Sequence, residues 1–133
     1  MRKVEWPIKE FAVLYAGFSK SNISPPIGAP LAGFAARNGF CEGIHDDLFA
    51  RALVLESSGQ AVAFVSLDVL AMPAEFVNAV RESIQAATGI GRDSIVIACT
   101  RTHAGPVTVK TFFNPEASLD QGHIVPRAFL CLV

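Results

Sequence analysis

Charge is scarce in this sequence of 133 residues, and its scarcity excludes several classes of function. Only 17% of the residues are Asp, Glu, Lys or Arg, and 11 basic side chains against 12 acidic ones leave a formal net charge of −1. These charges are scattered along the chain, whereas a nucleic-acid surface requires a basic patch and electrostatic membrane docking requires a polybasic segment. We therefore expect neither a nucleic-acid partner nor a membrane surface that is held by charge.

Long hydrophobic runs and paired cysteines are missing as well. Although 51% of the residues are hydrophobic, no apolar run approaches the roughly 20 residues of a membrane-spanning helix. The basic start, Met1–Pro7, is followed by neither a hydrophobic segment nor an evident cleavage site, so no export signal and a cytoplasmic location are expected. The three cysteines, Cys41, Cys99 and Cys131, are odd in number and widely spaced, which predicts no disulfide.

The recurring short apolar runs predict a single α/β domain over residues 1–133. We expect strands at residues 11–18, 48–56, 61–67 and 94–99, a helix at 73–88, and a long loop rich in Pro and Gly from residue 19 to residue 43. The turn signal at residues 57–60 predicts an antiparallel hairpin between the second and third strands.

A strand–helix–strand unit over residues 61–99 is the most specific element of this pattern. Pro73 suits the first turn of the helix, and Gly89 suits the left-handed position after its end. Phe76, Val80 and Ile84 lie on one helical stripe. The two strands of a βαβ unit are parallel, so the fold class is α/β with a mixed sheet.

Polar side chains follow both strands of this unit at the points where they end. Asp68 comes directly after the first strand, and Arg101 and His103 come after the second. Parallel strands end at the same edge of a sheet, about 5 Å apart as neighbours or about 10 Å apart with one strand between them. Ligands collect at this edge in open α/β sheets, so we predict a site at which Asp68 orients Arg101 or His103.

More than one role fits each of these three residues. His103 is either a proton carrier or metal ligand, or a loop histidine with one hydrogen bond. Arg101 either binds an anion or forms a structural pair with Asp68. Asp68 itself fits a helix-entry or supporting carboxylate better than a directly catalytic one.

A second polar cluster, His45-Asp46-Asp47, offers oxygen and nitrogen ligands that suit a cation. In an extended chain His45 and Asp47 would share a face, whereas Asp46 would point the other way. A turn with solvated charges is the simpler interpretation. His123 stands alone after a glycine and is expected at the surface.

Five segments, taken in order, resemble the amino-terminal part of the neutral/alkaline non-lysosomal ceramidases and their bacterial relatives. They are Ala16–Pro26, Ala32–Arg37, Gly43–Ala52, Val65–Asp68 and Thr100–Pro106. The resemblance implies a partial ceramidase-like catalytic domain that performs metal-assisted hydrolysis of the N-acyl amide bond of ceramide-like lipids. The implied partner is a small-molecule or lipid amide.

The resemblance also implies zinc, and here this sequence departs from the family pattern. The last segment reads His-Thr-His-Ser-Gly-Pro in the family, where the first His binds zinc and the second contacts the substrate. Arg101 stands at the first position and His103 at the second. A guanidinium stays protonated and cannot replace a neutral imidazole as a zinc ligand, so His103 is the one metal-ligand candidate. The other family ligands lie far beyond the length of this chain.

A different class of function also fits the sequence: a non-catalytic binding or assembly module derived from the same fold. Residues 107–113 predict either a strand or a loop, and the chain stops within the apolar run 128–133. An uncovered sheet edge together with an apolar tail favours association into a homo-oligomer.

Overall fold

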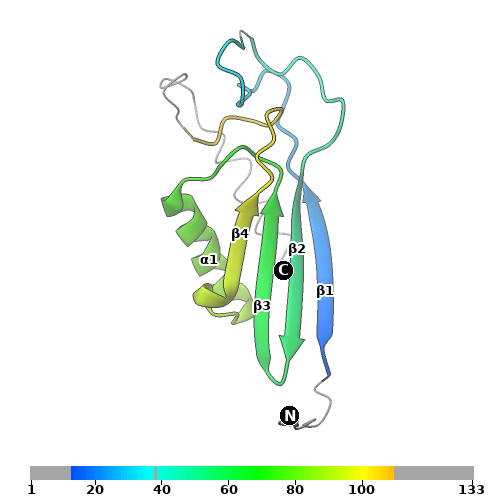
Figure 1. Ribbon diagram of the computed structural model, residues 1–133, viewed down its shortest axis with the longest axis vertical. Helices are drawn as coiled ribbons and strands as arrows, with labels where there is room; N and C mark the ends of the chain where they lie inside the picture. The colour runs from blue at the N-terminus through cyan, green and yellow to red at the C-terminus, as the bar shows by residue number, and fades with distance from the viewer. Residues whose placement is uncertain (1–12, 38, 110–133) are drawn as a thin grey trace, which may run out of the picture.

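The computed structural model describes residues 13–37 and 39–109 of the chain. Four strands form one sheet in the order β1-β2-β3-β4 (Figure 1). The elements are β1 (Tyr15–Asn22), β2 (Phe49–Ser57), β3 (Gln60–Leu67), α1 (Ala74–Thr88), a short 3-10 turn (Arg92–Ser94) and β4 (Ile95–Cys99). Strand β2 is antiparallel to both of its neighbours, β1 and β3, whereas β4 is parallel to β3. The predicted α/β class with a mixed sheet is thus confirmed.

The hairpin between β2 and β3 is tighter than the sequence predicts. Ser57 pairs with Gln60, so that only Ser58 and Gly59 form the turn, with φ of 53° and 77°. Two consecutive positive φ values characterise a type I′ turn, whose twist matches that of the flanking strands. The antiparallel hairpin is confirmed, and its turn is two residues long.

The prediction for the first strand, residues 11–18, is wrong in its bounds. The strand runs from Tyr15 to Asn22, and residues 11 and 12 lie outside the described part of the chain. Residues 19–22, which were expected to begin the long loop, pair with β2 as far as Phe49. Backbone groups along a sheet need hydrogen-bond partners, and β2 supplies them here in spite of the polar sequence of β1.

The βαβ unit forms as the sequence predicts. Helix α1 starts after Pro73 and ends at Gly89, which has a φ of 77° and donates its N–H to the Gln85 carbonyl at 2.9 Å. Strand β3 pairs with β4 up to Leu67 and Cys99, which lie opposite each other. The two strands of the unit are therefore direct neighbours.

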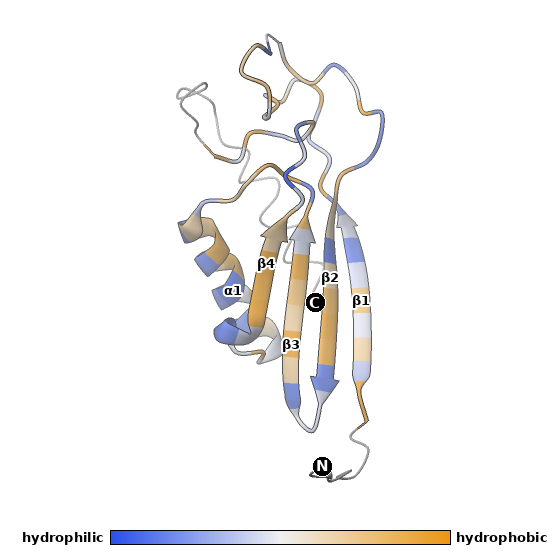
Figure 2. Cartoon of the chain, in the orientation of Figure 1, coloured by the Kyte–Doolittle hydropathy of each residue, from blue (hydrophilic) through white to orange (hydrophobic). Residues whose placement is uncertain are grey.

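The core lies between α1 and one face of the sheet. Apolar residues of β2, β3 and β4 contact the apolar stripe of the helix; the buried members include Ala52, Val65, Leu67, Ile95, Phe76, Val80 and Ile84. Burial of each large side chain contributes about 1.5–3 kcal/mol of hydrophobic free energy. Strands β2 to β4 are largely hydrophobic whereas α1 carries polar residues on its outer side (Figure 2). The opposite face of the sheet is not covered by α1.

The loops that follow β1, β3 and β4 gather at one end of the sheet (Figure 1). Among the described residues of 23–48 the pairing is limited to isolated bridges, Pro30 with Phe40 and Leu31 with Pro106. Residues 107–109 form no strand, and residues 110–133, including His123 and Cys131, lie outside the described part. Of the helices in the described ranges, none is both long and apolar enough to cross a membrane.

Candidate functional site

The polar residues after β3 and β4 emerge at the same edge of the sheet, as predicted from the βαβ unit. The N–H of Thr100 donates to the Leu67 carbonyl at 2.9 Å, and the N–H of Arg101 donates to the Val69 carbonyl at 3.0 Å. These hydrogen bonds continue the pairing of β3 and β4 past the strand ends, and they join the segment after β3 to the segment after β4. Asp68, Arg101 and His103 therefore belong to two neighbouring segments at one edge of the sheet.

Asp68 is held by β2 and not by the segment after β4. Its Oδ2 accepts a hydrogen bond from the Phe49 N–H at 2.9 Å and one from the Arg51 guanidinium at 2.7 Å. The Asp68 side chain is only 14% exposed, against 48% for that of Arg51. Within the described residues, its ion pair is thus with Arg51 where the sequence suggested Arg101 or His103.

The register of the sheet explains this difference. Leu67 lies opposite Ala50, and the Asp68 N–H donates to the Phe49 carbonyl at 3.0 Å. The carboxylate consequently lies beside the start of β2, where Arg51 projects from the same strand. The pairing could not be found from residues 61–103 alone, because it depends on the antiparallel neighbour of β3.

Arg101 presents its guanidinium to solvent from a left-handed backbone position. Its φ is 60°, a conformation that costs a non-glycine residue about 1–2 kcal/mol. The residue is exposed, and no hydrogen bond or ion pair of its guanidinium is formed within the part of the chain that the structure describes. Arg101 is thus an exposed cation on a left-handed turn at this edge of the sheet.

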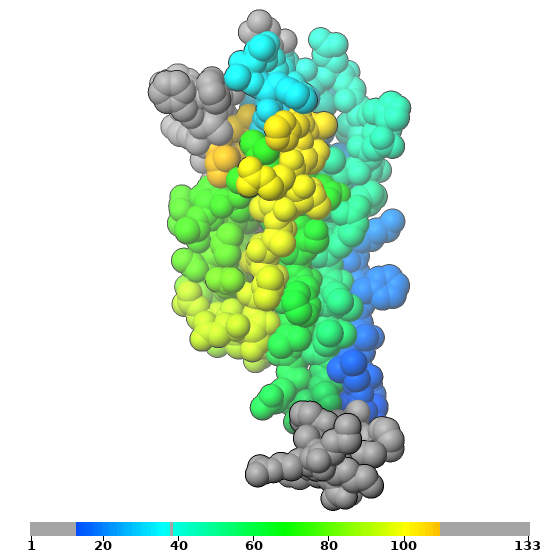
Figure 3. Space-filling model, in the orientation of Figure 1, coloured from blue at the N-terminus to red at the C-terminus, as the bar shows by residue number. Residues whose placement is uncertain are grey.

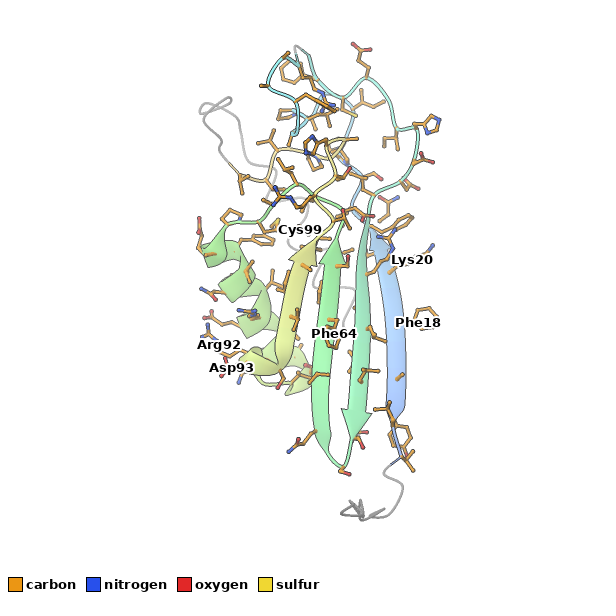
Figure 4. The ribbon with its side chains drawn as sticks, in the orientation of Figure 1. Phe18, Lys20, Phe64, Arg92, Asp93 and Cys99 are labelled. Atoms are coloured by element: carbon orange, nitrogen blue, oxygen red, sulfur yellow. The ribbon has the colours of Figure 1, made fainter. Side chains whose placement is uncertain are left out.

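Cys99 lies just before this turn, at the end of β4 (Figure 4). Burial raises the pKa of the Cys99 thiol, and the charge of Arg101 opposes that effect only in part. This shift disfavours the thiolate, which is the form in which a cysteine acts as a nucleophile. Cys99 and Cys41 are both free.

His103 is positioned by the loop that follows β1, a contact that the sequence did not reveal. A Cβ atom added to Gly33, whose φ is 110°, would lie 2.5 Å from both the Cα and the Cβ of His103. The Phe34 ring stands edge-on to the imidazole, with the ring centroids 5.3 Å apart. The two segments can approach this closely only because residue 33 has no side chain.

Arg37 fastens the same loop to the His103 segment. Its guanidinium donates to the Ala32 carbonyl at 2.9 Å and to the His103 carbonyl at 3.1 Å, and it lies 5.0 Å from the centre of the Phe34 ring. We call Gly33, Phe34 and Arg37 the His103 clasp. The sequence signal for it was a Gly-Phe pair followed by an arginine within the long loop.

The second polar cluster does not assemble as a cation site. His45 Nδ1 lies 2.7 Å from Asp46 Oδ2, and both side chains are almost fully exposed. Asp47 instead accepts a hydrogen bond from the Ser24 hydroxyl at 2.8 Å, and that bond is the main cause lowering its pKa. His45 and Asp47 thus do not act together, and the interpretation as solvated turn charges fits the structure.

Comparison with known proteins identifies the family. The sequence model described as "Neutral/alkaline non-lysosomal ceramidase, N-terminal" matches residues 15–121. The chain belongs to this ceramidase family. Two curated relatives named neutral ceramidase, from Drosophila melanogaster and Drosophila pseudoobscura pseudoobscura, are each 34% identical over 99 residues. These matches cover 71% of this chain and 14% of each relative, so the chain spans about one seventh of their length.

Solved ceramidase structures share the fold. The crystal structure of neutral ceramidase from Pseudomonas aeruginosa superposes with a TM-score of 0.77 at 20% identity, covering 92% of this chain and 21% of that one. A ceramidase complexed with C2 gives a TM-score of 0.73, also at 20% identity, and covers 90% of this chain and 20% of that one. The described sheet and helix therefore share the fold of about one fifth of each of these ceramidases.

The ceramidase resemblance implies zinc, but the donor atoms in the described residues do not fit it. Catalytic zinc needs about three protein ligands, and a guanidinium is not one of them. Residues 13–37 and 39–109 contain no group of three His, Cys, Asp or Glu side chains that could hold a metal. At this edge the chain offers one imidazole, His103, beside the permanent cation Arg101.

Proposed function

We propose that this chain carries one edge of an amidohydrolase site that acts on the N-acyl amide bond of ceramide-like lipids. The single observation that supports this most is the parallel pairing of β3 and β4, which places Asp68 at the same edge of the sheet as Arg101 and His103, within the region matched by the ceramidase family. Family membership supports the reaction class. The activity of this part alone is the element to be tested.

The residues of this edge suggest separate roles in amide hydrolysis. His103 would take a proton from the attacking water, whose oxygen forms a bond to the carbonyl carbon. The Arg101 guanidinium would stabilise the negative charge that develops on the carbonyl oxygen. The carbon–nitrogen bond then breaks, and the proton passes from His103 to the departing nitrogen, giving a carboxylic acid and an amine.

In this proposal Asp68 supports the site without touching the substrate. Its carboxylate fixes Arg51 and the start of β2, and its main chain lies beside Gly105, where an added Cβ would be 3.2 Å from the Asp68 carbonyl oxygen. We assign it the role of holding the edge in shape, and the roles that touch substrate to Arg101 and His103.

A second candidate function is a non-catalytic binding or assembly module. The observation that favours it is the sheet face opposite α1, which presents large apolar side chains, including Phe18 and Phe64, to solvent. A short part of a larger fold with such a face is suited to association even where it turns over no substrate.

Hydrolysis of a short-chain N-acylsphingosine, with released amine and fatty acid quantified by mass spectrometry, separates the two candidates. We expect equimolar products from the chain, a loss of about 100-fold or more on His103→Ala, and little change on the matched variant His45→Ala, since His45 is also an exposed loop histidine. Turnover that survives His103→Ala would reject the assigned role. No turnover above a no-protein control would leave the assembly module as the function.

A further inference from the structure

We propose that Phe34 is a positioning residue for His103, whose imidazole it orients by ring contact in place of a hydrogen bond. The Phe34 ring is held in turn by Arg37. The expected effect on turnover rests on the hydrolysis proposed above, whereas the orientation of the imidazole does not depend on it.

The imidazole of His103 forms no hydrogen bond with residues 13–37 or 39–109. Within these ranges the residue is bonded through its main-chain carbonyl, which accepts from the Arg37 guanidinium at 3.1 Å. A histidine that exchanges protons or binds a metal is ordinarily oriented by a hydrogen bond at its second ring nitrogen. Here the Phe34 ring takes that place, with the two ring centroids 5.3 Å apart and the ring planes at 79°.

The angle between the two rings makes this contact directional. The edge of an aromatic ring is electropositive and its face is electronegative, so perpendicular rings at this separation attract each other. Rotation of the imidazole about its Cβ–Cγ bond would change the angle of 79° and weaken the attraction. An aliphatic side chain of similar size at position 34 would fill the space without resisting that rotation.

Arg37 fixes the Phe34 ring and the His103 main chain relative to each other. The guanidinium carbon lies 5.0 Å from the centre of the Phe34 ring. The same group donates to the His103 carbonyl and, at 2.9 Å, to the Ala32 carbonyl. A planar guanidinium can serve two carbonyls and an aromatic face at once, which the compact ammonium of a lysine does less well. Both rings of the contact are thus tied to one side chain.

The loop that carries Phe34 and Arg37 is itself seated on the segment after β4. The N–H of Gly28 donates to the Cys41 carbonyl at 2.8 Å, which closes the loop at its base. The N–H of Ala32 donates to the Gly105 carbonyl at 2.9 Å, which fastens the loop beside the turn. In Figure 3 the cyan atoms of the loop lie directly against the yellow atoms of that segment. The ring contact is therefore supported by main-chain bonds on the same two segments.

NMR spectroscopy of the full chain with isotope-labelled histidine tests the orientation without any turnover. We expect a single His103 rotamer in the native chain and averaging among rotamers in Phe34→Leu, which keeps an apolar side chain but removes the ring. Phe34→Tyr keeps the ring and should retain the single rotamer. Phe40→Leu is the matched control, since Phe40 is 65% exposed against 60% for Phe34 and lies in the same loop.

Arg37→Met should produce the same averaging, because it removes both bonds to carbonyls and the cation over the Phe34 ring. Arg81→Met is its control, since Arg81 also donates to a main-chain carbonyl, that of Ile95 at 3.0 Å, but does so from α1. Circular dichroism checks that each variant is folded. In hydrolysis of a short-chain N-acylsphingosine we expect kcat to fall about tenfold in Phe34→Leu, with KM changed by less than about twofold.

Several outcomes would overturn the proposal. Averaging of the His103 rotamers in the native chain, or a single rotamer in Phe34→Leu, would each do so. Equal averaging in Phe40→Leu or Arg81→Met would show a general loosening of the loops instead. A fall in kcat without a change of rotamer would assign Phe34 to direct substrate contact. Absence of turnover in the native chain would reject the proposed hydrolysis, and the rotamers would still decide the role of Phe34.

Discussion

Gly33 lies so close to His103 that any side chain at position 33 would collide with the His103 backbone. The close approach joins the loop after β1 to the segment after β4, and Phe34 and Arg37 complete the contact. The imidazole is thus fixed by residues about 70 positions earlier in the chain. A site on two loops gains its rigidity from such contacts, because the loops themselves have no ladder of backbone bonds.

Replacement of Gly33 by alanine should therefore be more damaging than the same change at a glycine with open space around it. Gly39 is the matched control, because its φ of 118° is similar and an added Cβ would meet nothing within 4 Å. We expect Gly39→Ala to lower the free energy of unfolding by about 1 kcal/mol, and Gly33→Ala by about 2 kcal/mol more.

Urea unfolding of both variants measures this difference, and the NMR resonances of the His103 ring report on the site directly. Only Gly33→Ala should shift them. Equal losses of stability in the two variants would contradict the clasp.

Arg101 is the residue at which this chain leaves the metal-binding pattern of its family. Arg101→His would restore a second imidazole beside His103, and we expect the variant to take up zinc about tenfold or more tightly than the native chain. Metal content after equilibrium dialysis against zinc measures the change, and Arg101→His combined with His103→Ala is the control. A native chain that already holds one zinc, lost on His103→Ala, would contradict the proposed role of Arg101 as an anion-binding cation.

Among the elements, the β2–β3 hairpin requires a positive φ at both turn residues, and only one of the two is a glycine. Gly59 accommodates a positive φ without cost, but Ser58 is held at a φ of 53°, where asparagine is favoured. The turn joins β2 and β3 at the end of the sheet opposite the Asp68–Arg51 pair.

Ser58→Asn should raise the free energy of unfolding by about 0.5 kcal/mol, and Ser58→Val should lower it by about 1 kcal/mol. Thermal and urea unfolding provide both numbers. Ser57→Asn is the control, since Ser57 ends β2 with an ordinary strand conformation and should gain nothing. A similar gain in both asparagine variants would show that the turn geometry is not the cause.

At the scale of the whole molecule, the main hydrophobic core of the described fold is formed by helix α1 packing on one face of the sheet. Ile84 of α1 is completely buried against the sheet, and Ile44, which lies in a loop, is about half exposed. The asymmetry makes the stability of the described fold depend on the α1 side of the sheet.

Ile84→Ala should lower the free energy of unfolding by about 3 kcal/mol, whereas Ile44→Ala should cost less than about 1 kcal/mol. Urea unfolding followed by circular dichroism measures both losses. Loss of helix signal without loss of sheet signal in Ile84→Ala would show that the two layers do not fold as one unit.

Local sequence patterns account for the elements that the structure confirms. The helix is predicted to within one residue at its start by Pro73, its apolar stripe and Gly89. A strand on each side of this helix then predicts a parallel pair of strands. The common edge of Asp68, Arg101 and His103 follows from that pair. The sequence does not predict the end of the first strand, because its last residues are polar and belong to the sheet only through their pairing with β2.

The sequence by itself therefore determined the α/β class, the βαβ unit and the edge at which the polar residues collect, since each of these depends on short-range periodicity and capping. Only the tertiary structure decided that Asp68 binds Arg51, that Gly33 and Arg37 position His103, and which face of the sheet α1 covers. Those contacts join segments far apart along the chain. Their partners are set by strand register and loop packing, which no local pattern encodes.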